Sequence, residues 1–195
     1  MAPPNDSNGS GEADDSSLAA LAQDGDEAAF GALMRRWKEP LYRLLRRYVG
    51  DPAEAYDVLQ ETFVTIWTSL ASFNSSRPFG PWARRIALNK ARDHARRRAV
   101  RRFFFTAAPL DEVFVAHPAS QGNEDEKLTA DQRLDALDRA IANLPYGLKA
   151  PLILTVFEGQ SQAQAAVLLG LTEKAVELRV ARARKALQTQ LKDEG

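Results

Sequence analysis

The chain has 195 residues, and its 26 Lys or Arg balance its 26 Asp or Glu, so the formal net charge at pH 7 is zero. It contains no cysteine and only two histidines, which excludes disulfides and thiolate metal sites and indicates neither a metal nor a cofactor. No apolar run approaches the roughly 18 residues that span a membrane, and the N-terminus lacks the pattern of a signal peptide. We therefore expect a cytoplasmic protein with no membrane-inserted part.

The zero net charge hides an uneven distribution of charge along the chain. Residues 1–27 contain seven acids and no base, whereas residues 84–102 contain nine Arg or Lys and a single acid, Asp93. A basic segment in a neutral chain is typical of a surface that binds a polyanion, with acidic segments elsewhere.

The first half of the chain predicts a helical domain over residues 17–102. Residues 1–16 are polar and acidic, and we expect them to be disordered. Apolar residues at three- and four-residue steps predict an amphipathic helix from Phe30 to Tyr48, which Gly50 ends. Asp51 and Pro52 then start a helix that reaches Leu70. A loop over 72–80 precedes a basic helix, which we expect from Pro81 or Trp82 to about Arg98.

The second half predicts a linker and a second helical domain. Residues 103–128 lose the helical period and are interpreted as a flexible interdomain linker, so we expect the two domains to be loosely coupled in the free chain. Helical periodicity returns over 129–195, with a break at 145–147 and an apolar helix over 152–157. No segment alternates in strand fashion. The predicted fold is all-α, with two helical domains joined by a flexible linker.

The second domain contains the pattern of a helix-turn-helix. Counting from Gln162, Ala166 occupies the fifth position, where two helices cross closely, and Gly170 the ninth, where the turn favours a positive φ. Leu171 and Val176 fill the buried tenth and fifteenth positions, and the last helix is basic. We favour DNA binding over the alternative, an ordinary helical hairpin with a solvated charged face.

The basic helix of the first domain predicts a second nucleic-acid surface. Arg85, Asn89, Arg92 and Arg96 follow one another at steps of four, three and four, which places them on one helix face. Arginines in such a stripe can follow a phosphate backbone, and an asparagine can read a base edge. Aromatic residues beside them suit unstacked bases. The alternative is that the aromatics are core residues and the arginines serve solubility.

Taken together, these motifs resemble a known family. The segment DVLQETFVTIW (57–67) resembles the D-x-x-Q-E-x-F helix of sigma-70-type transcription initiation factors. The pattern from Phe73 to Arg97 is similar to the region that follows this helix in the family, and residues 136–187 look like its domain 4. No domain fits between the two blocks. This two-domain plan is similar to that of the extracytoplasmic-function (ECF) group of sigma factors.

The resemblance implies a function and roles for named residues. It implies an ECF sigma factor, which is not an enzyme, and which directs core RNA polymerase to promoters and helps to open the −10 element. The implied partners are the β′ clamp helices and the β flap of core RNA polymerase, promoter DNA and an anti-sigma factor. The implied core-binding residues are Asp57, Gln60, Glu61 and Phe63. The implied −10 residues are Phe73, Asn74, Ser75, Phe79, Trp82, Arg85, Asn89, Arg92 and Arg96. The implied −35 residues are Lys174, Glu177, Leu178, Arg179, Ala181, Arg182 and Arg184. The acidic linker would pass near the polymerase active site and RNA exit path.

Some positions depart from the family pattern, and one alternative function stays open. Glu177 stands where the family usually has a base, Leu178 where it has a small polar residue, and Ala181 where it has an aromatic residue or His. Tyr56 takes a position that is often acidic. The alternative function is a stand-alone helix-turn-helix regulator whose first domain is an effector or dimerisation module.

Overall fold

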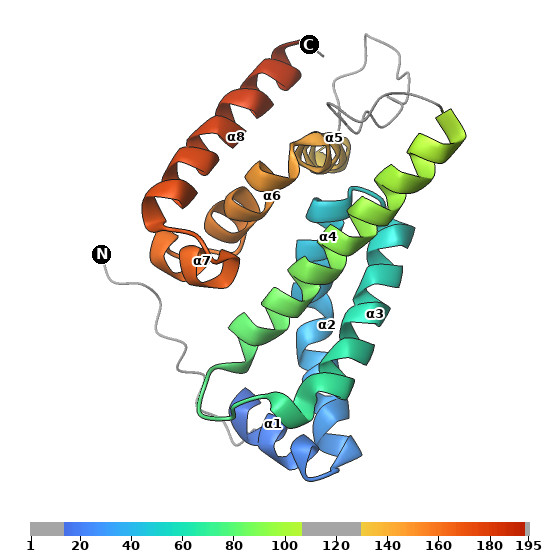
Figure 1. Cartoon of the computed structure of the whole chain (residues 1–195), viewed down its shortest axis with the longest axis vertical. Coiled ribbons are helices and arrows are strands. Elements are labelled where there is room, and N and C mark those ends of the chain that lie inside the picture. The colour runs from blue at the N-terminus through green and yellow to red at the C-terminus, as the bar shows by residue number, and fades with distance from the viewer. Residues whose placement is uncertain (1–13, 107–129, 194–195) are drawn as a thin grey trace.

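The computed structural model describes residues 14–106 and 130–193, and every regular element in these two ranges is helical. The first bundle consists of α1 (Asp15–Gln23), α2 (Glu27–Val49), α3 (Pro52–Ser69), the short η1 (Leu70–Ser72) and α4 (Phe79–Thr106). The second bundle consists of α5 (Ala130–Asn143), α6 (Tyr146–Leu152), η2 (Ile153–Phe157), α7 (Gln162–Leu169) and α8 (Glu173–Asp193). The prediction of an all-α, two-domain chain is confirmed (Figure 1).

Local sequence signals account for most helix ends of the first bundle. Gly50 ends α2 with a φ of 86°, in the left-handed region where glycine carries no steric penalty. Directly after it, Asp51 caps α3, because its carboxylate accepts a hydrogen bond from the Glu54 N–H at 2.9 Å. The predicted helix start at Asp51 and Pro52 is therefore confirmed.

One helix of the first bundle begins inside the predicted tail, and another extends beyond its predicted end. Asp14 caps α1 by accepting from the Ser17 N–H, so the helix begins at Asp15, inside the segment predicted to be a disordered tail. Helix α4 begins at Phe79 and continues to Thr106, beyond the expected end at Arg98. No helix-breaking residue occurs between Arg98 and Pro109, which explains the extension. The rest of the predicted tail and linker, residues 1–13 and 107–128, lies outside the described residues.

The second bundle departs from the expectation around Pro151. The sequence predicted a break at 145–147 and a helix over 152–157, whereas α6 already begins at Tyr146 and has Pro151 inside it. The next residues form the wider turn of η2, in which the Glu158 N–H donates to the Ile153 carbonyl at 3.0 Å. Proline has no N–H to donate, and a wider turn is one way in which the backbone accommodates this loss.

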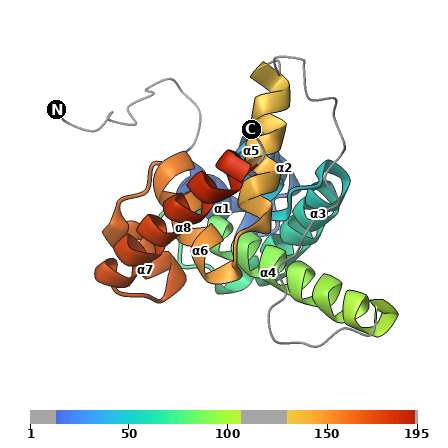
Figure 2. The same cartoon turned by 90° about the horizontal axis from the view of Figure 1, so that it is seen from above.

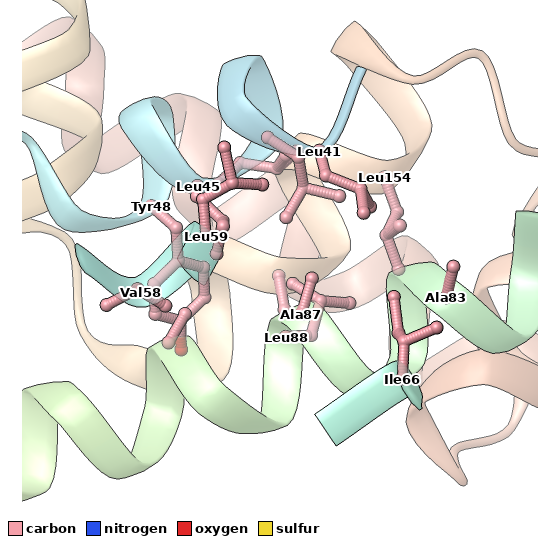
Figure 3. Close-up of a cluster of buried hydrophobic side chains, with 14 of the residues drawn as sticks. Leu41, Leu45, Tyr48, Val58, Leu59, Ile66, Ala83, Ala87, Leu88 and Leu154 are labelled. Atoms are coloured by element: carbon pink, nitrogen blue, oxygen red, sulfur yellow. The ribbon is translucent and has the colours of Figure 1, made fainter. Parts of the chain in front are cut away.

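The two bundles pack against each other along α2 and α4, which the expectation of loose coupling did not anticipate (Figures 1 and 2). Leu154 of η2 is fully buried and lies in the same apolar cluster as Leu41 of α2 and Leu88 of α4 (Figure 3). A Cβ atom at Gly50 would collide with the Cβ atom of Ala142, so α5 approaches the end of α2 closely. The two domains thus share one continuous core.

Candidate polymerase and nucleic-acid interfaces

The exposed face of α3 carries the residues expected to bind core polymerase. Asp57 and Gln60 are exposed, and Glu61 is half-buried because both of its carboxylate oxygens accept from one Arg97 nitrogen at 3.1 Å. Phe63 is only 8% exposed and packs into the core of the first bundle. Three of the four expected residues therefore form a polar surface, while Phe63 supports the helix from beneath.

An apolar groove adjoins this polar surface, between α2 and α3. It has a volume of about 720 Å³. Its lining includes Met34, Tyr56, Val64 and Trp67, all of which are exposed, and it shares Gln60 and Val64 with the polar surface. The sequence analysis did not find this groove, because the exposed face depends on how α2 and α3 cross.

The loop between η1 and α4 is held in shape by side-chain hydrogen bonds. The Asn74 Oδ1 accepts from the backbone N–H of Ser76 at 3.0 Å and from its hydroxyl at 2.7 Å. From α1, the Gln23 amide donates to the carbonyls of Leu70 at 2.8 Å and Phe73 at 2.7 Å. Ser75 is exposed at the tip. Gln23 was missed by the sequence analysis, because nothing in its neighbourhood points to a loop about fifty residues away.

The aromatic residues of this region form a packed cluster. The ring centroid of Phe73 lies 4.8 Å from that of Trp82 and 5.7 Å from that of Phe79. Phe73 and Phe79 are buried, at 6% and 2% exposed, whereas Trp82 is half-buried. The alternative considered for the aromatics, that they are core residues, therefore describes Phe73 and Phe79, and Trp82 is the ring that retains an exposed surface.

The predicted stripe on α4 exists, and part of it faces the second bundle. Arg85, Asn89, Arg92 and Arg96 are all exposed along one side of the helix. The first three line a cleft of about 250 Å³, whose opposite wall includes Tyr146 and residues 168–170 of the second bundle.

One arginine of the stripe is engaged across this cleft. The Arg92 Nη1 lies 3.4 Å from the Tyr146 hydroxyl, and its guanidinium lies 5.9 Å from the ring centroid. The hydrogen bond with Tyr146 raises the pKa of Arg92, so this side chain stays charged.

A buried lysine lies close to this cleft. Lys149 of α6 is 7% exposed, and its ammonium lies 5.4 Å from the ring centroid of Tyr48 on α2. Burial lowers the pKa of Lys149 to about 8, with a further contribution from Arg98. Removal from water also raises the pKa of Tyr48, so this phenol stays neutral. Lys149 belongs to the second bundle and Tyr48 to the first, so the burial of Lys149 depends on the packing of the two bundles.

The helix-turn-helix has the predicted geometry. Ser161 and Gln164 form a capping box at the start of α7, and Gly170 ends this helix with a φ of 65°. Ala166 and Val176 are buried where α7 and α8 meet, at 5% and 0% exposed. Leu171, expected to be buried, is only half-buried, and the other predicted positions of the helix-turn-helix are confirmed.

The expected −35 residues lie along α8. Lys174, Glu177, Leu178, Ala181, Arg182 and Arg184 are exposed, and Arg179 is half-buried. Lys174 pairs with Glu177 at 2.8 Å, so these two charges partly neutralise each other on this face of α8. The face therefore combines an ion pair, an apolar Leu178 that is 49% exposed, and arginines further along the helix.

Comparisons with known proteins agree with this geometry. Residues 33–101 match the model of sigma-70 region 2, and residues 134–187 match that of sigma-70 region 4. The RNA polymerase sigma factor CnrH of Cupriavidus metallidurans is 37% identical over 176 residues, which cover 89% of this chain and 92% of the relative. The ECF RNA polymerase sigma factor SigM of Mycobacterium tuberculosis is 31% identical, with coverage of 90% and 84%.

A solved structure has the same architecture. The structure of CnrH in complex with the cytosolic domain of CnrY has a TM-score of 0.67 and 33% sequence identity, and covers 93% of this chain and 99% of that chain. Within residues 14–106 and 130–193, no helix is long and apolar enough to cross a membrane.

The fold and its surfaces define a two-domain transcription initiation factor that carries a helix-turn-helix. The match to region 2 covers most of the first bundle. The alternative, a stand-alone helix-turn-helix regulator, does not account for this bundle and is not supported. The chain belongs to the sigma-70 family of RNA polymerase sigma factors, within its extracytoplasmic-function group.

Proposed function

We propose that this sigma factor, which directs core RNA polymerase to promoters and helps to open the −10 element, divides its work among three surfaces. The polar face of α3 binds core polymerase, α4 with its preceding loop binds the −10 element, and α8 binds the −35 element. The observation that carries the division is the alignment of four exposed side chains, three of them arginines, on α4 beside a loop whose shape is fixed from α1.

Core docking uses Asp57, Gln60 and Glu61, which turn towards the β′ clamp helices. These side chains are exposed or half-buried, so replacing them removes contacts with a partner without disturbing the core. We expect Gln60→Ala combined with Glu61→Ala to weaken core binding while unfolding stability changes by less than about 1 kcal/mol, because the Glu61–Arg97 pair is exposed to solvent. Pull-down of core polymerase without DNA measures this loss. Unchanged core affinity would reject the assignment.

At the −10 element, the arginines hold phosphates and Asn89 contacts a base edge. Arginine carries no sequence information when it binds phosphate, whereas an amide can bond to adenine in a bidentate manner. In the loop, Asn74 shapes the turn, Ser75 contacts the extruded base, and the half-buried Trp82 offers its ring for stacking. Phe73 and Phe79 hold the loop from the core rather than stacking on bases.

At the −35 element, α8 enters the major groove with Lys174, Arg179, Arg182 and Arg184 towards the phosphates. The centre of its exposed face reads base edges through Glu177, Leu178 and Ala181, since a carboxylate accepts from cytosine and apolar side chains contact the thymine methyl group. The second bundle also binds the β flap of the polymerase.

The apolar groove between α2 and α3 suits a protein inhibitor. We expect an anti-sigma factor to insert apolar side chains of a helix between Met34, Tyr56 and Trp67, which are exposed in the free chain. The groove shares Gln60 and Val64 with the core-docking face, so such a partner competes with polymerase. The solved CnrH relative is itself bound to the cytosolic domain of CnrY.

Run-off transcription with core polymerase on a promoter library randomised at the −10 element tests the −10 assignment. Replacing Arg92 and Arg96 together with alanine should reduce transcription from all sequences alike, whereas replacing Asn89 with alanine should change the preferred sequence. Arg43→Ala with Arg139→Ala, two exposed arginines away from α4, is the matched control for lost charge. A shift in sequence preference by the arginine variant, with only lower output by the Asn89 variant, would reverse the two roles.

A further inference from the structure

We propose that the cavity between α2, α4, α5 and α6 is a binding site for one small monovalent anion of the size of chloride, held by the ammonium of Lys149. The site goes beyond the surfaces proposed for polymerase and DNA, because none of the residues assigned to those surfaces lines it. Its wall comes from both bundles. The site therefore exists only while the bundles are packed together, an arrangement that we call closed.

The cavity has room for one small ion. Its volume is about 30 Å³, which is roughly two to three times the space that a single water molecule needs. Sulfate and phosphate carry four oxygen atoms around a central atom and are too large for it. Much of the wall is apolar and includes Val49 of α2, Ala91 of α4 and Ala142 of α5. A ligand is therefore held by the few polar side chains of the wall.

Lys149 is a buried cation of this wall without an anionic partner in the described part of the chain. It is only 7% exposed. Within residues 14–106 and 130–193, no acceptor bonds to its ammonium and no carboxylate pairs with it, and the ammonium lies 5.4 Å from the ring centroid of Tyr48. An ammonium has three donors, and a buried charge is costly unless it is paired. An anion in the cavity supplies the opposite charge and accepts from these donors.

The other charged side chains beside the cavity do not balance Lys149. Arg98 also lines the cavity and lowers the pKa of Lys149 further, as expected for two cations that lie close together. Glu54 of α3 pairs with Arg98 at 3.0 Å and lies 3.9 Å from the Nε2 atom of His94, but it is not part of the wall. Burial lowers the pKa of His94, so this ring is mostly neutral at pH 7. Among these four side chains, one negative charge faces two positive charges.

A bound anion would change the protonation of Lys149. Because the anion binds the charged lysine and not the neutral one, it opposes the lowering of the pKa by burial. Water in the same cavity has no net charge, and its effect does not depend on which salt is present. The pKa of Lys149 in different salts therefore distinguishes an anion site from a hydrated cavity. Chloride should also move the pH range in which closure changes, and the range set by burial alone is observed in gluconate.

The test follows the titration of Lys149 in the full chain. The ε-carbon resonances of labelled lysines are recorded by NMR against pH in sodium gluconate, sodium chloride and sodium sulfate at equal ionic strength, and Lys149→Met identifies the signal. Gluconate is too bulky for the cavity, so Lys149 should titrate near its pKa of about 8 in this salt. Chloride should raise this pKa progressively, by about one when its concentration is about ten times its Kd, because it binds only the charged form.

Sulfate and a second lysine serve as matched controls. At equal ionic strength sulfate screens the charge of Arg98 as chloride does, but it does not fit the cavity, so it should not reproduce the effect of chloride. Bound chloride also broadens the NMR signal of chloride in solution. This broadening should decrease in Lys149→Met and persist in Lys185→Met, which removes an exposed lysine of α8 far from the cavity wall.

Each outcome supports or overturns the anion site. A pKa of Lys149 that is the same in gluconate and chloride would show that the cavity takes water only. An equal rise in chloride and sulfate would show screening of Arg98 instead of binding, and equal broadening in wild type and Lys149→Met would place the bound chloride elsewhere. If Lys149→Met does not fold, sequential assignment of the wild-type chain identifies the signal and the titration still decides. None of these results bears on the −10 assignment, which run-off transcription tests separately.

Discussion

Helices α4 and α8, which we propose as the −10 and −35 reading helices of this sigma factor, differ in access. The proposed reading face of α8 is exposed apart from the half-buried Arg179, while that of α4 forms one wall of a cleft between the bundles. Both sets of side chains have solvent-exposed surface. The difference shows that a residue can be exposed to solvent and still be out of reach of a macromolecule. A DNA strand needs a continuous open surface along the helix, and α4 has none while the bundles are together.

The charged side chains of the two helices also differ in where their partners lie. On α8, Lys174 pairs with Glu177 of its own helix. On α4, Arg92 is engaged by Tyr146 and Arg84 by Glu158, both from the other bundle. Separating the bundles therefore changes the partners of α4 and leaves the Lys174–Glu177 pair as it is. We expect −35 binding to be constitutive and −10 binding to be conditional.

The largest expected effect separates the two helices by salt dependence. In the holoenzyme, replacing Arg92 and Arg96 with alanine should lower the slope of log K against log salt for a −10 strand by roughly 0.7 for each lost phosphate contact. Replacing Arg182 and Arg184 with alanine should lower the slope for a −35 duplex by roughly 0.9 for each lost contact. In the free chain, the α8 variant should keep its full effect while the α4 variant shows almost none. Equal effects of the α4 variant in both forms would remove the distinction.

A glycine at the interface should produce the next largest effect. Gly50→Ala places a methyl group against Ala142 and should open the bundles, in addition to the roughly 1–2 kcal/mol that a left-handed residue with a side chain costs. Gly25→Ala is the matched control, since Gly25 has a φ of 95° with nothing within 4 Å of an added Cβ. Thermal unfolding and the radius of gyration should show destabilisation in both variants and expansion only in Gly50→Ala. Expansion in both would mean that the backbone strain alone separates the bundles.

The pH dependence of closure provides a third comparison. Burial lowers the pKa of Lys149 to about 8 from 10.5, so the charged lysine is penalised only in the closed chain. Below pH 8 the lysine is charged in both forms and this penalty is constant. Between pH 8 and 10.5 the closed form loses the proton first, so closure should strengthen as the pH rises, by about tenfold from pH 7 to pH 9.

Lys149→Met isolates this contribution, since it leaves the neighbouring Arg98, His94, Tyr48 and Tyr146 in place. Burial lowers the pKa of His94, so this side chain is neutral in both forms above pH 8. Burial raises the pKa of Tyr48 above its ordinary value of 10, so Tyr48 opposes the trend as the pH approaches 10, and the comparison is made between pH 7 and 9. The ratio of closed to open chain is measured against pH for wild type and for Lys149→Met. The difference between the two profiles is the contribution of Lys149. An unchanged pH profile in the variant would show that Lys149 does not enter the equilibrium.

The smallest expected effect concerns the loop before α4. Gln23→Glu keeps the shape of the side chain but cannot donate to the carbonyls of Leu70 and Phe73, and two such hydrogen bonds contribute about 1–3 kcal/mol to loop order. Hydrogen exchange at residues 73–78 should increase, and selectivity at the extruded −10 base should fall, while −35 binding stays unchanged. Unaltered exchange in the loop would assign Gln23 no role in shaping it.

The parts of the fold that the sequence predicted are those with local causes. The cap at Asp51 and the glycine ends at Gly50 and Gly170 depend on residues within one turn, and all three lie where the sequence indicated. The helix-turn-helix and the α4 stripe follow from spacing along one helix, which fixes which side chains share a face.

The features that the sequence did not predict depend on contacts between distant segments. Gln23 holds a loop about fifty residues away, and Glu158 binds an arginine that lies 74 residues before it. No periodicity marks either residue. The packing of the two bundles was not anticipated for a related reason: linker length limits only how far the domains can separate, whereas the apolar surface of Leu154 and its neighbours favours their packing.

The most direct test of the closed free chain is the distance between its bundles. Because the chain contains no cysteine, Ala53→Cys on α3 and Gln188→Cys on α8, both at exposed positions, accept a pair of dyes for energy transfer. The closed arrangement predicts one high-transfer population in the free chain, which moves to low transfer when core polymerase is added. A broad, low-transfer distribution in the free chain that core polymerase leaves unchanged would contradict it.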